Sequence, residues 1–429
     1  MNYVSTRGDA PAVPIGAALR AGLAPDGGLY VPATLPRLST ADFDGLVTLP
    51  AIGERLLRPF FAGDPLHEAL ASICASAFDF PAPLVRFGDE ASRLLELFHG
   101  PTAAFKDFGA RFLAECLARL RTPSDPALTI LVATSGDTGA AVAAAFHRRP
   151  GFRVVILYPD GRVSPRQAHQ LGCFGDNVLA LRVAGSFDDC QRLVKQALAD
   201  AALRERCPLS SANSISLGRL LPQMAYYAAA ALGHARTHAQ PLGLIVPTGN
   251  LGNALAAILV RAIGLPVGPV VLANNDNRVL ADFFAGADYA PRASVATLAN
   301  AMDVGAPSNF ERLVWLYPDP ARLREAVTAQ AVDDAAIRAT IAATAQRRGA
   351  VVCPHTACAV AVLDRLRAAG DRGDYAVVAT AHPAKFERIV EPLVGPVEPP
   401  PALAELLARP ATAEPLPASY PALHERLLA

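Results

Sequence analysis

The chain has 429 residues, which at roughly 150 residues per domain suggests two or three domains. Hydrophobic residues make up 52% and charged residues 18%, which excludes a disordered chain. The 39 basic residues balance 39 acidic ones, so the surplus of positive charge that nucleic acids or anionic membranes attract is missing. Seven scattered cysteines and an N-terminus without an apolar segment predict a cytoplasmic protein with free thiols and no membrane span.

The chain divides into segments of different pattern. Residues 1–95 alternate short helical patterns with Pro- and Gly-rich turns, and we expect an N-terminal region there without chemistry of its own. From residue 96 onward strands and helices alternate with short connections, which predicts parallel sheets covered by helices on both faces. Predicted strands lie at 127–133, 152–158, 177–183, 243–247 and 374–381, and predicted helices at 105–120, 187–200, 217–233 and 355–369.

Two α/β domains follow from this alternation. We expect a smaller domain at 96–205 and a larger one at 206–390. The tail at 391–429 is rich in proline, so we expect it to wrap the surface and not to form a domain. No internal repeat is convincing.

Lysine is scarce, since only Lys106, Lys195 and Lys385 are lysines and all other basic residues are arginines. A lysine, unlike an arginine, can lose its proton when desolvated and act as a nucleophile. Lys106 stands at the expected start of a helix between Phe105 and Phe108, and both an apolar setting and a helix N-terminus lower the pKa of an amine. A solvated surface lysine is the ordinary alternative.

Two glycine-containing turns each follow a strand and open a helix. They are SGDTG (Ser135–Gly139) and TGNLGN (Thr248–Asn253). Such turns expose backbone N–H groups at a helix N-terminus and can hold an anion. Neither is a dinucleotide fingerprint or a P-loop. Two of them at the ends of parallel strands predict two anionic groups in one crevice, although each alone is also compatible with a structural turn.

Three further segments have a functional and a structural interpretation. Asn213, Ser214 and Arg219 offer an amide, a hydroxyl and a guanidinium to a second phosphate, or else cap a helix. Thr380 ends a predicted strand. Its hydroxyl would either cap that strand or contact a ring nitrogen. Cys353, His355 and Cys358 have no usual zinc spacing, so we favour a helix start at His355 and expect no metal site.

These motifs resemble those of the threonine synthases, pyridoxal-phosphate enzymes of the tryptophan-synthase-β-like fold (fold type II). The similarity extends in family order from about residue 27 to 390 and is greatest to the longer fungal and bacterial form. It implies two parallel-sheet α/β domains with an extra N-terminal region. The matching stretches are GGLYVP, ELFHGPTAAFKDFGARF, ATSGDTGAAVA, VVILYP, SANSIS, GNLGN, LANAMDVGAPSN and TAHPAKF.

The resemblance also implies a role for each candidate residue. Lys106 would form the Schiff base with pyridoxal 5′-phosphate, and Thr380 would hydrogen-bond its pyridine nitrogen. The loop Gly249, Asn250, Leu251, Gly252 and Asn253 would surround the cofactor phosphate. Ser135, Gly136, Asp137 and Thr138 would cover the substrate carboxylate and the ring face, and Asn213, Ser214 and Arg219 would bind the substrate phosphate.

Leu251, Asn253 and Asp137 depart from the family pattern. Relatives often have Phe and Asp at the positions of Leu251 and Asn253. Asp137 stands where fold relatives have an Asn beside the 3′-oxygen of the cofactor ring, so two acidic oxygens would share a proton there.

The implied activity is that of a lyase acting on a phosphate ester. O-Phospho-L-homoserine would lose phosphate from Cγ and gain water at Cβ to give L-threonine, with the freed Lys106 amine moving the protons. We expect a monomer or weak homodimer. Three alternatives stay open: a phospho-lyase that releases a 2-oxo acid, a Ser/Thr dehydratase, and a binding protein without cofactor.

Overall fold

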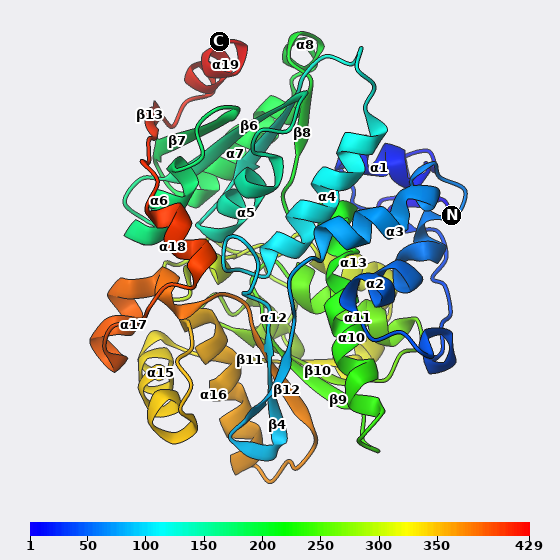
Figure 1. Ribbon diagram of the computed structural model, residues 1–429, viewed down its shortest axis with the longest axis vertical. Helices are drawn as coiled ribbons and strands as arrows, with labels where there is room; N and C mark the ends of the chain where they lie inside the picture. The colour runs from blue at the N-terminus through cyan, green and yellow to red at the C-terminus, as the bar shows by residue number, and fades with distance from the viewer.

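Two separate, mostly parallel sheets organise the computed structural model, which describes residues 1–429; the smaller sheet lies at the top of Figure 1 and the larger at the bottom. The smaller sheet contains β5 (Leu128–Ala133), β6 (Phe152–Pro159), β7 (Val178–Ala184), β8 (Leu209–Ser211) and β13 (Glu414–Pro417). The larger contains β3 (Leu84–Phe87), β4 (Asp89–Glu96), β9 (Leu242–Pro247), β10 (Val267–Asn274), β11 (Val327–Ala331) and β12 (Tyr375–Ala379).

The strand order is β13-β7-β6-β5-β8 in the smaller sheet and β11-β10-β9-β12-β4-β3 in the larger. All neighbours are parallel except the β3–β4 hairpin. A separate antiparallel pair, β1 (Tyr3–Ser5) and β2 (Tyr30–Pro32), lies in the N-terminal region. The predicted α/β class with parallel sheets is confirmed.

The helices occupy the following ranges. Before residue 200 they are α1 (Ile15–Ala21), α2 (Leu49–Leu57), α3 (Leu66–Ala77), α4 (Lys106–Leu120), α5 (Asp137–Phe146), α6 (Pro165–Gly172) and α7 (Phe187–Ala199). Then come α8 (Ala201–Arg206), α9 (Leu217–Leu220), α10 (Gln223–Ala235), α11 (Gly252–Ala262), α12 (Val279–Phe284), α13 (Phe310–Leu316), α14 (Pro320–Ala326), α15 (Asp334–Arg348), α16 (Pro354–Ala368), α17 (Glu387–Val394), α18 (Pro401–Leu407) and α19 (Tyr420–Leu428). Short 3₁₀ turns are η1 (Thr40–Phe43), η2 (Arg58–Phe61), η3 (Asn300–Met302) and η4 (Pro383–Phe386).

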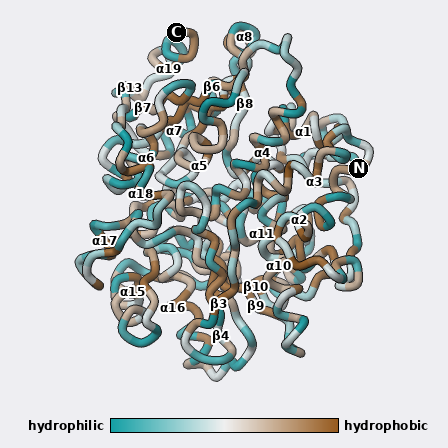
Figure 2. The backbone as a smooth tube through the Cα atoms, in the orientation of Figure 1, coloured by the Kyte–Doolittle hydropathy of each residue, from teal (hydrophilic) through white to brown (hydrophobic).

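The central strands of each sheet are buried on both faces, which is why β5, β6, β9 and β12 are mostly apolar in sequence. Successive side chains of a strand point to opposite faces. Ile130 and Val132 of β5 belong to the main core, whereas Leu131 and Ala133 pack with α7 and α19 in a second cluster. The larger sheet is buried in the same way between α10 and α11 on one face and α15 and α16 on the other. The hydrophobic stretches accordingly run through the middle of the molecule in Figure 2.

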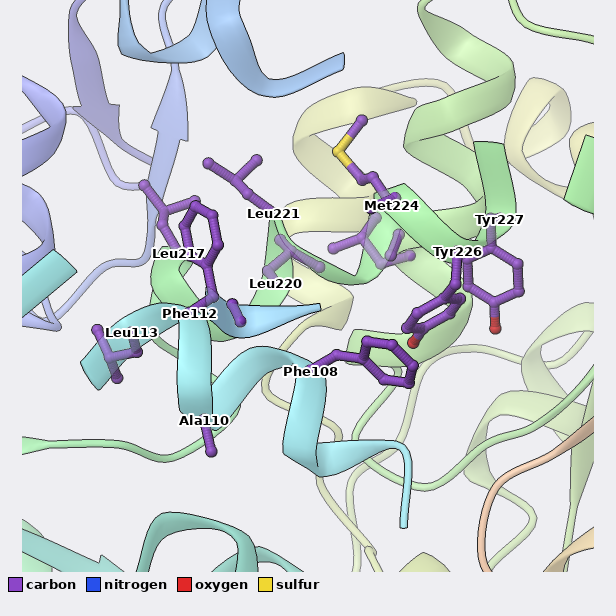
Figure 3. Packing of buried hydrophobic residues seen from close by; sticks show 14 of the residues in the cluster. Phe108, Ala110, Phe112, Leu113, Leu217, Leu220, Leu221, Met224, Tyr226 and Tyr227 are labelled. Atoms are coloured by element: carbon purple, nitrogen blue, oxygen red, sulfur yellow. The ribbon is translucent and has the colours of Figure 1, made fainter. Parts of the chain in front are cut away.

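Helix α4, which begins at Lys106, packs against the start of the larger domain. Figure 3 shows Phe108 and Phe112 of α4 beside Leu217, Leu220 and Tyr226 of α9 and α10. The rings of Phe108 and Tyr226 lie 5.1 Å apart between centroids, a favourable distance for a tilted aromatic pair. This packing fixes the lysine-bearing helix relative to the helices that follow residue 216.

The sheets divide the chain differently from the expected boundaries. Strands β3 and β4 fall in the expected N-terminal region but pair with the larger sheet, and β8 falls in the expected larger domain but pairs with β5 of the smaller sheet. Strand partners are set by contacts far along the chain, which local patterns do not contain. The single helix expected at 217–233 is two, α9 and α10, because Pro222 lacks the N–H that a continuous helix needs.

The proline-rich tail also differs from the expected surface wrap. It contains α18, β13 and α19, and β13 pairs in parallel with β7. Leu416, Leu423 and Leu427 of this tail are buried in the cluster that covers the smaller sheet. The tail therefore completes the smaller domain. No helix in the structure combines the length and apolarity that crossing a bilayer demands.

Candidate active site

A pocket lies at the carboxyl ends of strands β5, β9 and β12, where the connections after parallel strands converge. Every predicted site residue except Gly136 lines it. Gly136 instead lies against Gln167, and a Cβ added to it would come within 2.3 Å of the Gln167 amide nitrogen. The predicted residues in the lining are Lys106, Ser135, Asp137, Thr138, Asn213, Ser214, Arg219, Gly249, Asn250, Leu251, Gly252, Asn253 and Thr380.

The segment before Lys106 is bonded to the segment that contains Thr380. The amide of Phe105 donates to the carbonyl oxygen of Thr380 at 2.8 Å, and the amide of His382 donates to that of Ala103 at 3.0 Å. These bonds surround an antiparallel bridge between residues 104 and 381. Lys106, at the start of α4, and Thr380, just beyond β12, are thereby held on neighbouring chain segments.

The amine of Lys106 lies in surroundings that favour its neutral form. The residue is only partly exposed, and burial lowers the pKa of its amine from 10.5 to about 8. Asp137 opposes this change, while Arg219 and Lys385 add to it by repulsion between like charges. A neutral amine close to physiological pH is the form that attacks a carbonyl group.

The first turn of α11 and the loop before it line the pocket, and Asn253 in this turn carries an unpartnered donor. Two buried hydroxyls, of Tyr226 and Tyr227, donate to Oδ1 of Asn253 at 2.5 and 2.8 Å, and the Nδ2 of Asn253 is buried without a partner. Gly249 in this loop approaches Met302 so closely that an added Cβ would lie 2.7 Å from the Met302 Cα. The loop therefore allows close backbone approach, and the Asn253 amide that follows it has hydrogen-bonding capacity that no protein group uses.

A second set of donors comes from residues 213–219. Arg219 is buried, one of its Nη atoms donates to the carbonyl oxygen of Ala212, and its Nε has no partner. Burial lowers the pKa of Arg219 to about 10, so it stays charged at neutral pH. Ser214 joins this set to the glycine loop, since its hydroxyl accepts from Nδ2 of Asn250 at 2.5 Å.

Asp137 is a buried carboxylate at the start of α5. Its Oδ1 lies 2.9 Å from Nζ of Lys385 and accepts from Nε2 of Gln167 at 3.0 Å. Burial pushes the pKa of Asp137 upward, but the positive charges of Lys385 and Lys106 outweigh burial and hold it below its usual value. Asp137 is thus an anion inside the pocket wall.

His355 also lines the pocket and is neutral, because burial lowers the pKa of its imidazole to about 4. Its Nε2 accepts from the backbone amide of Ala301 at 3.1 Å. Helix α16 begins at Pro354, one residue before the expected start, and Cys353 caps it by accepting from the amide of Thr356 at 3.4 Å. The favoured interpretation of this motif as a helix start is confirmed.

Comparison with known proteins identifies the family. Models named pyridoxal-phosphate dependent enzyme, threonine synthase N terminus and threonine synthase C-terminal match residues 86–383, 2–78 and 356–427. The threonine synthase of Serratia marcescens is 39% identical, and the alignment covers 96% of this chain and 95% of that one; the Escherichia coli K12 enzyme is 38% identical with the same coverage.

The chain belongs to the threonine synthase family. Solved structures agree: the Escherichia coli threonine synthase superposes with a TM-score of 0.91 at 36% identity, and a threonine synthase from Brucella melitensis with bound pyridoxal phosphate gives 0.90 at 34%. Each comparison covers 100% of this chain and 99% of the other. The chain is a pyridoxal-phosphate-dependent lyase with threonine synthase activity, and it has the type II fold with an N-terminal region that the resemblance implied.

The residues of this threonine synthase pocket fit pyridoxal phosphate. The cofactor brings an aldehyde, which requires a neutral amine, and a phosphate, which requires unpartnered donors. Lys106 would supply the first, and the unpartnered Nδ2 of Asn253, in the first turn of α11, would supply the second. A carboxylate in place of the Asn253 amide would give no donor there.

Sequence reasoning did not anticipate Lys385 and His355 as parts of this site. His355 was expected only to begin a helix. Lys385 is fully buried against Asp137. Lysine is scarce in this chain, which directed attention to Lys106. The same scarcity applies to Lys385 and was the one signal in the sequence that could have identified Lys385.

Proposed function

We propose that this pocket converts O-phospho-L-homoserine and water into L-threonine and phosphate. The observation that carries the proposal is the presence of two sets of hydrogen-bond donors beside one lysine whose pKa burial lowers to about 8. The loop at 249–253 would hold the cofactor phosphate, and Asn213, Ser214 and Arg219 would hold the substrate phosphate. A single set would leave one of the two anions without partners.

We assign the bond with the cofactor aldehyde to Lys106 because its amine has no fixed partner. Lys385 donates to the carbonyl oxygen of Thr102 at 2.7 Å and pairs with Asp137, so its amine is engaged. Lys195 lies on the exposed surface of α7 at the edge of the pocket. Lys106 alone combines burial with an amine that is free to bond with the cofactor aldehyde.

Pyridoxal phosphate supplies, when bound, an electron sink that stabilises negative charge at the substrate carbons. The Lys106 amine, once released by the substrate, takes the proton from Cα and returns one there at the end. The hydroxyls of Ser135 and Thr138, at the start of α5, would orient the substrate carboxylate. Arg219 stabilises the charge that builds up on the departing phosphate, and Thr380 would donate its hydroxyl to the ring nitrogen.

A phospho-lyase that releases 2-oxobutanoate would use the same pocket. Purified enzyme incubated with O-phospho-L-homoserine separates the two functions when phosphate, threonine and 2-oxobutanoate are measured together. We expect one threonine per phosphate. A yield dominated by 2-oxobutanoate would replace the proposal by the phospho-lyase, and no phosphate release would reject both.

We further propose that the enzyme works in the cytoplasm as a monomer or weak homodimer. The support is chemical: all seven cysteines are free thiols and six of them are buried, an arrangement suited to a reducing compartment. Sedimentation over a range of concentrations tests the oligomeric state.

A further inference from the structure

One carboxylate lies among several basic groups beneath the pocket. Asp137 from α5 is 2.9 Å from Nζ of Lys385, and its charge also acts on Lys106 and His355. Lys385 is fully inaccessible to solvent, and Asp137 is nearly so. A lysine buried to this degree is uncommon unless it is paired, which points to a specific role for this ion pair.

The ion pair is held rigidly on both sides. Nζ of Lys385 donates to the carbonyl oxygen of Thr102, four residues before Lys106, at 2.7 Å. On the other side, Gln167 donates to Oδ1 of Asp137 at 3.0 Å. The carbonyl oxygen of Lys385 itself accepts from the hydroxyl of Ser164 at 2.7 Å. Hydrogen bonds beyond the ion pair itself therefore hold both side chains in place.

The titratable groups that act electrostatically on the Lys106 amine, or on which it acts, come from four elements. They are Asp137 of α5, Arg219 of α9, His355 of α16 and Lys385 of η4. The adjacent Asp107 accepts from the amide and hydroxyl of Thr102 at 2.8 and 2.7 Å. Asp137 is therefore the carboxylate available to Lys106 as a counter-ion, and Lys385 already neutralises it.

We infer that Lys385 is a positioning residue that occupies the carboxylate of Asp137, so that Asp137 does not pair with the Lys106 amine and this amine loses its proton more readily before it attacks the cofactor aldehyde. The inference rests on the proposed role of Lys106. Desolvation favours a neutral amine, whereas a free carboxylate nearby favours an ammonium ion. Without Lys385 the carboxylate would pair with Lys106 and suppress its reactivity.

The test is the pH dependence of cofactor attachment to the full-length chain after its cofactor has been removed with hydroxylamine. The attachment rate, followed by absorbance, should rise with a midpoint near pH 8 in the unaltered chain. Lys385→Met should raise this midpoint by about 1 to 3 pH units, because it frees one opposite charge. At pH 7 attachment should slow roughly 10- to 1,000-fold. Lys385→Arg keeps the charge and should keep the midpoint.

Two further variants test whether the freed charge of Asp137 causes the change in midpoint. Lys195→Met makes the same change at an exposed lysine and should leave the midpoint unaltered. Asp137→Asn combined with Lys385→Met removes both charges, so its midpoint should lie at or below that of the unaltered chain. If Lys385→Met alone does not fold, Lys385→Gln takes its place with the same expected rise of the midpoint.

An unchanged midpoint in folded Lys385→Met, or a raised midpoint in the double variant, would overturn the inference. A separate experiment, borohydride reduction of the unaltered enzyme followed by peptide mapping, tests the proposed role of Lys106. If it labels a residue other than Lys106, the proposed function of Lys106 fails, whatever the variants show.

Discussion

The backbone amide of Phe105 donates to the carbonyl oxygen of Thr380 across 2.8 Å, although the two residues belong to elements far apart in the chain. This bond connects the residue before Lys106 to the end of the central strand β12. The backbone segments that carry Lys106 and Thr380 are therefore held beside one another. The cofactor carbon that bonds with lysine and the ring nitrogen at its other side would be held by one rigid unit.

Thr380 offers the first prediction. A hydroxyl beside the ring nitrogen cannot hold a proton there as a carboxylate would, so negative charge would remain nearer the substrate carbons. Thr380→Ser should keep most activity. Thr380→Asp should change the absorbance spectrum of the bound cofactor, slow threonine formation and increase side products such as 2-oxo acids. An Asp variant with the parent's spectrum and product ratio would remove Thr380 from the site.

The second prediction concerns Arg219. Arg219→Ala should reduce turnover of O-phospho-L-homoserine roughly 10- to 150-fold, since charge-assisted hydrogen bonds contribute about 1.5–3 kcal/mol. Cofactor content, measured by absorbance, should be nearly unchanged. Arg219→Lys retains the charge but not the fork of donors and should recover part of the loss. Loss of bound cofactor in the Ala variant would instead place Arg219 on the cofactor side.

The third prediction concerns stability and pH. The pKa of Lys106 is lowered to about 8 by burial, so between about pH 8 and its ordinary 10.5 the unfolded chain binds more protons than the folded one. The resulting destabilisation is complete below pH 8 and fades as the pH rises toward 10.5. Lys106→Met should therefore stabilise the cofactor-free chain at pH 7 by about 1 to 3 kcal/mol and by less at pH 9.5.

Denaturant titrations at the two pH values measure this difference. Lys195→Met is the matched control, because its side chain is exposed and should change the free energy of unfolding by less than about 0.5 kcal/mol. A Lys106→Met chain that gains no stability at pH 7 would show that the amine is well solvated.

The fourth prediction compares two helical glycines. A Cβ on Gly109 of α4 would lie 2.9 Å from the backbone oxygen of Arg219 and 3.0 Å from its Nε, whereas one on Gly233 of α10 would meet nothing within 4 Å. Gly109→Ala should destabilise the fold by about 1–3 kcal/mol and lower activity by displacing Lys106 and Arg219. Gly233→Ala should stabilise it by about 0.5–1 kcal/mol. Thermal unfolding of both variants checks the sign of each change.

Local sequence was sufficient for elements whose signal is local. The runs at 128–133, 152–159 and 178–184 were predicted as strands within one residue, because a strand buried on both faces is mostly apolar. The Gly-containing turns were located for a similar reason, since the conformations they adopt require particular residues at fixed positions.

Contacts between distant segments could not be predicted, because local sequence patterns do not encode them. Nothing near β8 indicates that it pairs with β5, and nothing near Lys385 indicates that Asp137 lies beside it. Both depend on packing that brings distant segments together. The tail was misinterpreted because prolines usually mark irregular chain, yet β13 lies at a sheet edge, where missing N–H groups cost nothing.

The place of β13 at the edge of the smaller sheet has a consequence for synthesis. While the ribosome makes the chain, β7 stays unpaired on one side until residue 417 has emerged, long after every residue of the pocket. An open, apolar strand edge is a template for pairing with other chains. A premature stop codon shortly before residue 414 would leave every residue that lines the pocket in place. The truncated protein would lose its function by aggregation, although it keeps the side chains that the reaction needs.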